Sequence, residues 1–252
     1  MLSLLPAVVG VVATAILTYA AVAARALTRS AGVVAAVFGS VIVVVAGFPY
    51  LALLILFVAG SVLATRYRFE EKRSRNVQEG SHGERGVANV VAHILIPTAL
   101  ALTALGSPPV LPDSTRAVLY ASALAFGAAD TFASEFGVLS RHPRTLLHFQ
   151  AVEPGTNGGV SGVGEVFGFL GAASIAVIGF GLFVLFGETP MPELAFVLIV
   201  TIAGFIACQV DSVLGETLEN RGYLSKHSTN FLGMLSAVAI AAGLWLAIGG
   251  PG

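Results

Sequence analysis

The chain has 252 residues, of which 56% are hydrophobic and only 11% are charged, and its formal net charge is −1. The mean hydropathy is +0.88, whereas soluble domains carry about 25% charged residues. This composition excludes an ordinary soluble domain. We predict one integral-membrane domain over residues 1–252, with the lipid bilayer as a partner and no nucleic acid.

Apolar segments that are long enough to cross about 30 Å of hydrocarbon follow one another along the chain. The second and third could form one bent helix, because only Gly47-Phe48-Pro49 separates them and Pro is tolerated in transmembrane helices. The first lacks a basic N-terminal region and a cleavage site, so we expect a retained span. The fold class is therefore an all-α polytopic membrane protein with about eight transmembrane helices, at residues 5–24, 31–47, 49–65, 87–106, 115–138, 160–187, 194–217 and 229–249.

The basic residues test this helix count independently. If both termini lie outside the cell membrane, eight helices put all of the 13 basic residues except Arg116 in cytoplasmic loops, as the positive-inside rule expects. Losing one span would destroy this segregation. The cytoplasmic residues are Arg25, Arg29, Arg66, Arg68, Lys72, Arg73, Arg75, Arg85, Arg141, Arg144, Arg221 and Lys226.

The most charged segment is the cytoplasmic loop 66–86, which separates the N-terminal helices (1–65) from the helices that carry the candidate site (87–252). Most of this loop fits a solvated surface. Arg85 is the expected exception, because Gly83-Glu84-Arg85-Gly86 places it at the entrance to the fourth helix, and we predict that it binds phosphate. His93, two turns further in, is either an interhelical hydrogen-bond partner or a ligand.

Two predicted helices carry the same acidic pattern near their cytoplasmic ends. Ala129-Asp130-Thr131-Phe132-Ala133-Ser134-Glu135 and Val210-Asp211-Ser212-Val213-Leu214-Gly215-Glu216 both read Asp-(Thr/Ser)-x-x-(small)-Glu. A carboxylate in a membrane helix costs roughly 2.5 to 3.5 kcal/mol on insertion scales, so these groups need a compensating partner. We predict that Asp130, Glu135, Asp211 and Glu216 are catalytic.

Helix geometry favours a metal ion that is shared between the two motifs. An Asp and a Glu five residues apart are separated by about 7.5 Å along an ideal helix and point in different directions. Two facing motifs can each offer one carboxylate to Mg²⁺, which takes water and substrate phosphates as its other ligands. We predict Mg²⁺ as the cofactor, held by Asp130 and Asp211. The alternative is an ion-coupled transporter, in which these acids carry protons or Na⁺.

A basic, glycine-rich segment follows the first motif. It contains Arg141 and Arg144, which we predict to clamp phosphates, and then Gly155-Thr156-Asn157-Gly158-Gly159-Val160-Ser161. Glycines let backbone N–H groups approach phosphate oxygens, and the start of a helix adds its positive dipole end. A flexible turn that enters a packed helix fits the same pattern. The predicted phosphate cradle consists of Gly155, Thr156, Asn157, Gly158, Gly159 and Ser161.

The same order of features, an acidic helix, a basic loop, a Thr-Asn pair and a glycine-containing helix, recurs more weakly around the second motif. Here Thr229-Asn230 matches Thr156-Asn157. We interpret this as a parallel duplication of a helix pair in the C-terminal half, with the site at the repeat interface. This interpretation adds Asn230 to the predicted phosphate-binding residues. Because the matching stretch is short, coincidence is the alternative.

Three ordered stretches, at 129–137, 155–161 and 211–218, resemble the plant phytyl-phosphate kinases and their bacterial and archaeal integral-membrane relatives. The resemblance covers most of the chain, and the chain departs from it at Asn89, His93 and Ile94 and in the short stretch 221–228. It implies a Mg²⁺-dependent prenyl-phosphate kinase. Such an enzyme transfers a phosphoryl group from a nucleoside triphosphate, CTP above all, to a prenyl monophosphate such as phytyl or geranylgeranyl phosphate.

We therefore expect a prenyl monophosphate and a nucleoside triphosphate as partners, bound at the cytoplasmic face. The alternatives are the transporter, a CTP-dependent cytidylyltransferase that acts on a lipid phosphate, and a structural membrane protein. A kinase yields a nucleoside diphosphate, a cytidylyltransferase yields pyrophosphate, and a transporter consumes no nucleotide.

Overall fold

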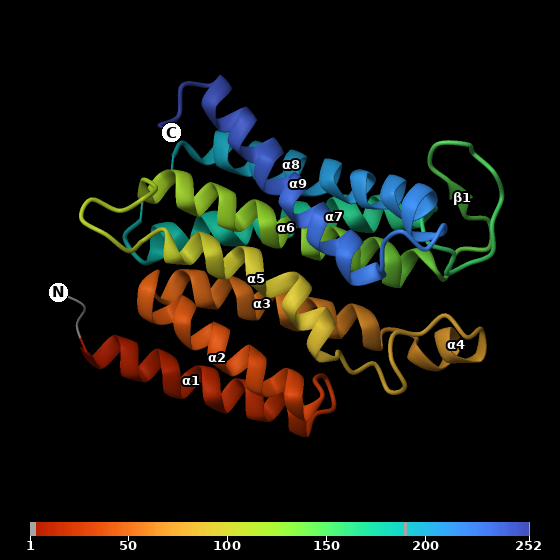
Figure 1. Cartoon of the computed structure of the whole chain (residues 1–252), viewed down its shortest axis with the longest axis horizontal. Helices are drawn as coiled ribbons and strands as arrows, with labels where there is room; N and C mark the ends of the chain where they lie inside the picture. Colours follow the sequence, from red (N-terminus) through yellow and green to blue (C-terminus); the bar gives the residue numbers. More distant parts are fainter. Residues whose placement is uncertain (1–3, 189–190, 252) are drawn as a thin grey trace.

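The computed structural model describes residues 4–188 and 191–251, and these residues form an all-α bundle. A short helix α4 (Phe69–Ser74), a π-helical turn η1 (Gly215–Glu219) and a ladder of β1 (Arg144–Thr145) with β2 (Gly159–Val160) lie between the long helices. The predicted all-α polytopic class is confirmed. The long helices alternate in direction (Figure 1) and are α1 (Leu4–Ala23), α2 (Arg29–Val45), α3 (Phe48–Arg66), α5 (Val87–Leu102), α6 (Asp113–Gly137), α7 (Gly162–Leu185), α8 (Glu193–Leu214) and α9 (Lys226–Ala247).

Six of the long helices are apolar and long enough to cross a membrane, while α2 and α5 are apolar but have only 17 and 16 residues. The second and third predicted spans are separate helices. The chain turns at Gly47, whose φ of +99° suits a residue without a Cβ. Pro49 then occupies the first turn of α3, where the missing N–H of Pro needs no partner.

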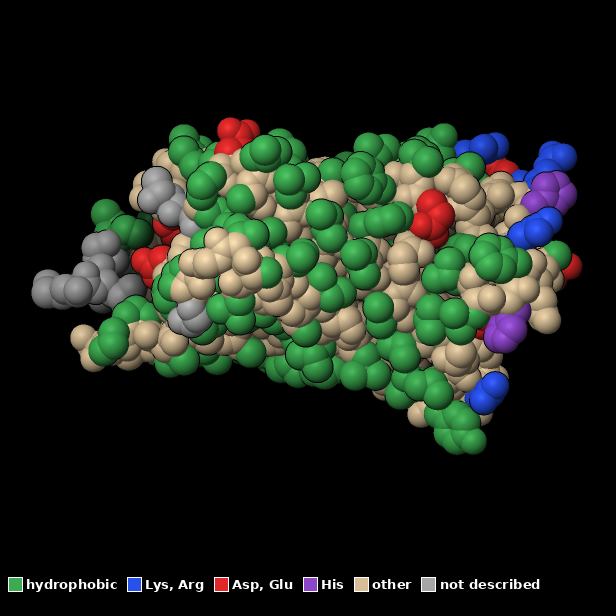
Figure 2. Space-filling view, turned by 90° about the horizontal axis from the view of Figure 1, so that it is seen from above, with side chains coloured by type: hydrophobic (Ala, Val, Ile, Leu, Met, Phe, Trp, Pro, Cys, Tyr) green, Lys and Arg blue, Asp and Glu red, His purple; other side chains and the backbone are tan. Residues whose placement is uncertain are grey.

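The two ends of the bundle differ in charge. Helix α4 and strand β1 lie at one end, whereas α1 begins and α9 ends at the other (Figure 1). On the face drawn in Figure 2, Lys and Arg side chains gather at the end that carries α4 and β1, and hydrophobic side chains cover most of the remaining length. We call the end with α4 and β1 the basic end. Its position agrees with the charge segregation that the sequence predicts.

Accessibility labelling is expected to confirm this course of the chain. Single cysteines at Ser74, after α4, and at Ser140, after α6, should react with an impermeant maleimide from one side of the membrane, the cytoplasmic side. A cysteine at Ser107, between α5 and α6, should react only from the other side. The native Cys208 is buried, and a Cys208→Ala background removes its signal. Labelling of positions 74 and 140 from opposite sides would contradict eight spans.

Helix α6 forms the centre of the bundle and packs against α3, α5, α7, α8 and α9. Small residues make this possible. A Cβ added to Gly171 of α7 would lie 2.7 Å from the carbonyl oxygen of Ala128, and one added to Gly204 of α8 would lie 2.8 Å from the carbonyl carbon of Ala125. The helices therefore approach at backbone distance, as in other membrane bundles. This packing fixes the ends of α6 and α8, which carry the acidic motifs, relative to each other.

Candidate functional site

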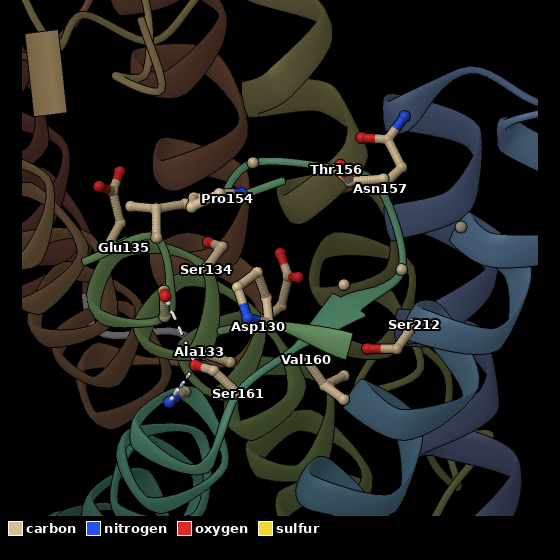
Figure 3. Close-up of a pocket in the computed structure, with 18 of the residues that line it drawn as sticks. Asp130, Ala133, Ser134, Glu135, Pro154, Thr156, Asn157, Val160, Ser161 and Ser212 are labelled. Atoms are coloured by element: carbon tan, nitrogen blue, oxygen red, sulfur yellow. Dashed lines mark hydrogen bonds between the residues drawn. The ribbon is translucent and has the colours of Figure 1, made fainter. Parts of the chain in front are cut away.

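A polar cavity of about 370 Å³ opens at the basic end, where α6 and α8 end and α7 and α9 begin. Segments 76–79 and 154–161 complete its wall. Figure 3 shows the second segment, with Pro154, Thr156 and Asn157, beside Asp130 and Ser134 of α6. The volume falls within the range of about 300 to 1,000 Å³ that is typical of small-molecule sites.

The cavity collects most of the residues that the sequence singles out. It is lined by Asp130, Glu135, Asp211, Gly155, Thr156, Asn157, Gly158, Gly159, Ser161 and Asn230. A small adjoining cavity is lined by Arg85, together with Asp130 and Asn230. Glu216, Arg141 and Arg144 are not among the residues that line either cavity. Both arginines are exposed, so the predicted phosphate clamp lies outside the cavity.

Asp130 and Asp211 come from neighbouring helices and face the same space. The Oδ1 atom of Asp211 is buried and has no hydrogen-bond partner among the described residues. A buried polar atom without a partner costs free energy, and two carboxylates in one low-dielectric cavity repel each other. This pair therefore has the features of a cation site.

The side chain of Glu135 points toward Lys72 of α4 and not toward Asp130 of the same motif. Its Oε2 atom accepts a hydrogen bond of 2.7 Å from Nζ of Lys72, and its Oε1 atom accepts one of 2.7 Å from the Thr65 hydroxyl. Lys72 is fully buried and also donates to the carbonyl oxygens of Ala64 and Thr65, at 2.9 and 3.3 Å. The sequence predicts a solvated loop here. Instead, the buried ion pair fastens α4 to the ends of α3 and α6.

Glu216 also binds a neighbouring segment, but unlike Glu135 it does not line the cavity. Its carboxylate accepts hydrogen bonds from the backbone N–H of Leu147, at 2.9 Å, and from Nδ1 of His148, at 2.5 Å. It lies within η1, a π-helical turn of a kind that is frequent at functional sites. In both motifs the Asp thus faces the cavity and the Glu holds a neighbouring segment. Five residues correspond to about 140° of rotation on an ideal helix, which explains the division.

The glycine-rich segment packs directly on the end of α8. Gly158 has a φ of +74°, and an added Cβ would lie 2.6 Å from the carbonyl oxygen of Ser212. An added Cβ on Gly215 would lie 2.8 Å from the backbone nitrogen of Gly158. Close packing therefore requires these glycines, whether or not a phosphate binds. Ser161 begins α7 as its N-cap and accepts a hydrogen bond of 3.1 Å from the N–H of Gly164.

Gly158→Ala is expected to destabilise the protein by about 2 kcal/mol or more, because the left-handed conformation and the contact with the α8 backbone both disfavour a side chain. Gly162→Ala is the matched control, since its added Cβ meets nothing within 4 Å. Gly162→Ala should leave the free energy of unfolding unchanged. Unfolding by denaturing detergent in mixed micelles measures both variants. Equal stability would contradict the close packing.

Two cationic side chains reach the cavities. Arg85 is buried and donates to Oδ1 of Asn89, at 3.2 Å, and to the Thr65 hydroxyl, at 3.4 Å. Lys226, the first residue of α9, lines both cavities and forms an ion pair of 2.9 Å with Glu79. No sequence motif pointed to Lys226, Glu79 or Lys72 as site residues. The chain contains only two lysines, at positions 72 and 226, and this rarity was a usable signal.

Asn230 is oriented by His93. Nδ1 of His93 lies 2.9 Å from the carbonyl oxygen of Asn89, which can only accept, so Nδ1 carries the proton. The free Nε2 then faces the Asn230 amide nitrogen at 3.5 Å. His93 is thus an interhelical hydrogen-bond partner, one of the two roles that the sequence leaves open. The amide oxygen of Asn230 takes no part in this contact, and Asn230 lines both cavities.

The proposed duplication is seen only in the order of the elements. Helix pairs α6–α7 and α8–α9 follow each other, and the second acidic motif also ends beside the cavity. However, Thr156 and Asn157 lie in an irregular segment, whereas Thr229 and Asn230 lie inside the first turns of α9. Of these four residues, Thr156, Asn157 and Asn230 line the cavity. The two Thr-Asn pairs are therefore not equivalent in local structure.

The helical bundle is that of a polytopic all-α membrane protein, with a polar candidate site at the basic end. Residues 12–244 match the family described as "Integral membrane protein DUF92", and the chain belongs to this family.

Relatives with this similarity occur in archaea, cyanobacteria and plants. The chain is 31% identical over 209 residues to an uncharacterized membrane protein of Methanocaldococcus jannaschii, MJ0933, covering 82% of this chain and 81% of the relative. It is 31% identical over 198 residues to an uncharacterized membrane protein of Synechocystis, sll0875, covering 77% and 73%. It is 30% identical over 198 residues to Protein PGR of Arabidopsis thaliana, covering 71% and 68%. No solved structure matches the chain.

Proposed function

We propose that the protein is a membrane-embedded prenyl-phosphate kinase, which transfers a phosphoryl group from a nucleoside triphosphate, CTP above all, to an isoprenyl monophosphate. The observation that carries this proposal is the convergence of the acidic helix ends, Lys226 and the glycine-rich backbone on one polar cavity. Cationic side chains and backbone N–H groups suit phosphate oxygens. The resemblance to phytyl-phosphate kinases supplies the direction of the reaction.

The position of the cavity suits a substrate with a phosphate head and an apolar tail. Helix α7 borders the cavity with Gly164 and Glu165 at its start and exposes Val166, Phe169 and Leu170 on its side. A prenyl chain can lie along such a surface in the hydrocarbon while its phosphate reaches the cavity. Diffusion within the membrane then delivers the lipid, and the nucleotide enters from the aqueous side.

Asp130 and Asp211 fit a Mg²⁺ ion. Among residues 4–188 and 191–251, no group of three or more His, Cys, Asp or Glu side chains is placed to hold a metal by itself. Mg²⁺ commonly takes only one or two carboxylates and completes its shell with water and substrate phosphates. The unpartnered Oδ1 of Asp211 agrees with such a ligand. When bound, the ion supplies charge neutralisation between the phosphates of the two substrates.

The remaining residues bind and orient phosphates. Lys226 and Arg85 offer positive charge in the small cavity that Asp130 also lines, and the backbone of segment 155–159 lines the main cavity. Phosphoryl transfer depends mainly on positioning and electrostatic stabilisation. A strong general base is unnecessary, because a phosphate monoester is already anionic at neutral pH. The chain therefore needs no Ser, Cys or His nucleophile for this reaction.

An assay with purified protein tests the proposal. The protein is incubated with geranylgeranyl or phytyl phosphate, Mg²⁺ and each of CTP, ATP, GTP and UTP, and the lipids are analysed by mass spectrometry. We expect lipid diphosphate together with a nucleoside diphosphate. Release of pyrophosphate would identify a cytidylyltransferase instead. Solute flux that follows an ion gradient without nucleotide consumption would identify a transporter, and either result would overturn the proposal.

A further inference from the structure

The two cations of the site differ in how firmly they are held. Arg85 is buried and its guanidinium is tied to Asn89 and Thr65. Lys226 is about half exposed, with a relative side-chain exposure of 53%, and donates one hydrogen bond among the described residues, to Oε2 of Glu79. An ammonium group has three donors, so Lys226 keeps donor capacity toward the cavity.

Glu79 belongs to the cavity wall and not to a helix. It lies in the irregular stretch between α4 and α5, next to Gly80, whose φ is +60°. Burial by itself would raise the pKa of the Glu79 carboxyl, but the ion pair with Lys226, aided by nearby Arg85, holds this pKa below its ordinary value. An ionised carboxylate of the protein thus occupies the cationic part of the cavity.

A carboxylate and a phosphoryl group make the same kind of contact with an ammonium group, since both present anionic oxygen acceptors. Exchange of one for the other leaves Lys226 paired in both states. This matters because breaking an ion pair without replacement leaves an uncompensated charge. The backbone of Glu79 belongs to no regular element, so moving its side chain away from Lys226 breaks no helix or strand.

We propose that Lys226 binds a phosphoryl group of a ligand. While the cavity is empty, the Glu79 carboxylate binds Lys226 at the position that this phosphoryl group takes when the ligand is bound. The inference rests on the proposed function in taking a phosphate ester as the ligand. It assigns a binding residue outside the acidic motifs and the glycine-rich segment. It also assigns the 76–80 stretch a part in ligand entry.

Binding of inorganic pyrophosphate, with Mg²⁺ present and no second substrate, tests the proposal by calorimetry. Glu79→Gln should lower the Kd about tenfold, because the competing anion is gone, and Lys226→Met should raise it about tenfold. Adding Glu79→Gln to Lys226→Met should change nothing further, since no cation remains to be released. Glu71→Gln is the matched control: Glu71 pairs with Arg68 and Arg75 outside the cavity, and the Kd should stay the same.

The same variants distinguish the two sources of phosphate. Kd values for CTP and for geranylgeranyl monophosphate are measured separately, and Glu79→Gln should tighten the ligand whose phosphate meets Lys226. A lower Kd of the Glu79→Gln protein for either CTP or geranylgeranyl monophosphate supports the proposal. A Glu79→Gln protein that binds pyrophosphate, CTP and the lipid no more tightly than the wild type would overturn it.

Hydrogen exchange of the wild-type protein keeps the test independent of the folding of any variant. Pyrophosphate should increase amide exchange in residues 76–80, because it releases Glu79 from Lys226. Unchanged or slower exchange in this stretch at saturating pyrophosphate would overturn the proposal. Failure of the kinase assay is a separate result: a protein that shows this binding pattern but transfers no phosphoryl group would contradict the proposed activity and leave the role of Lys226 and Glu79 standing.

Discussion

Asp130→Asn and Asp211→Asn are each expected to lower prenyl-phosphate kinase turnover about a thousandfold or more while the protein stays folded. Each change removes one of the two carboxylates that line the cavity and that we propose to hold Mg²⁺. The double variant should lose little more than either single variant, because residues that act as a unit give strongly non-additive losses. Turnover is measured as lipid diphosphate formed at several Mg²⁺ concentrations.

Asp113→Asn provides the control on the same helix. Asp113 is the first residue of α6, its side chain is 71% exposed, and it pairs with Arg116 at the end of the bundle away from the cavity. Its loss should leave turnover unchanged. Near-normal turnover of either the Asp130→Asn or the Asp211→Asn protein at all Mg²⁺ concentrations would refute the metal site. The transporter would then be the better interpretation of the buried acids.

Glu135 and Glu216 are expected to matter less for the chemistry, because each holds a neighbouring segment. The buried partner of Glu135 has the larger effect on stability. Lys72→Met should lower the free energy of unfolding by about 3 to 5 kcal/mol, since the carboxylate of Glu135 stays buried without its cation. Unfolding by denaturing detergent in mixed micelles measures this loss.

Two further variants make the stability test specific. Lys72→Met combined with Glu135→Gln should regain most of the lost stability, because no unpaired charge remains. Arg73→Met is the matched control, because Arg73 is the next residue on α4 and its ion pair with Glu70 lies on the surface, with 3.9 Å between nitrogen and oxygen. Such exposed pairs contribute about 0 to 1 kcal/mol to stability. If Lys72→Met and Arg73→Met were equally stable, the buried pair would not fasten α4 to the bundle.

The helix count was predictable because hydropathy acts locally and strongly in a membrane. The ends of helices were less predictable, because polar caps determine them. Helix α9 begins at Lys226, three residues before the predicted span, since the Ser225 hydroxyl accepts the N–H of Ser228 and starts the helix. Helix α5 ends at Leu102 instead of residue 106. Apolar residues continue beyond that end, so composition alone did not mark it.

Part of the site was also predictable. The repeated Asp residues lie near two helix ends that border one cavity, and the glycine-rich segment lines the same cavity. Arg141 and Arg144 lie elsewhere. A basic residue near a motif in sequence can point to solvent, and these two do, whereas Lys226 reaches the cavity from a helix that begins after the second motif.

The sequence by itself determined that this is a multi-spanning membrane protein, that its basic loops share one end, and that two Asp residues lie on separate membrane helices, where we predict a common partner. Each conclusion follows from the high cost of placing charge in hydrocarbon, which acts on every residue regardless of its neighbours. Only the tertiary structure decided which Glu holds a loop, which glycine is required by packing, and which cation faces the cavity. These roles depend on contacts between residues far apart in the sequence, such as Lys72 with Glu135, 63 positions apart, and Glu79 with Lys226, 147 positions apart, which only the packing of the helices brings together.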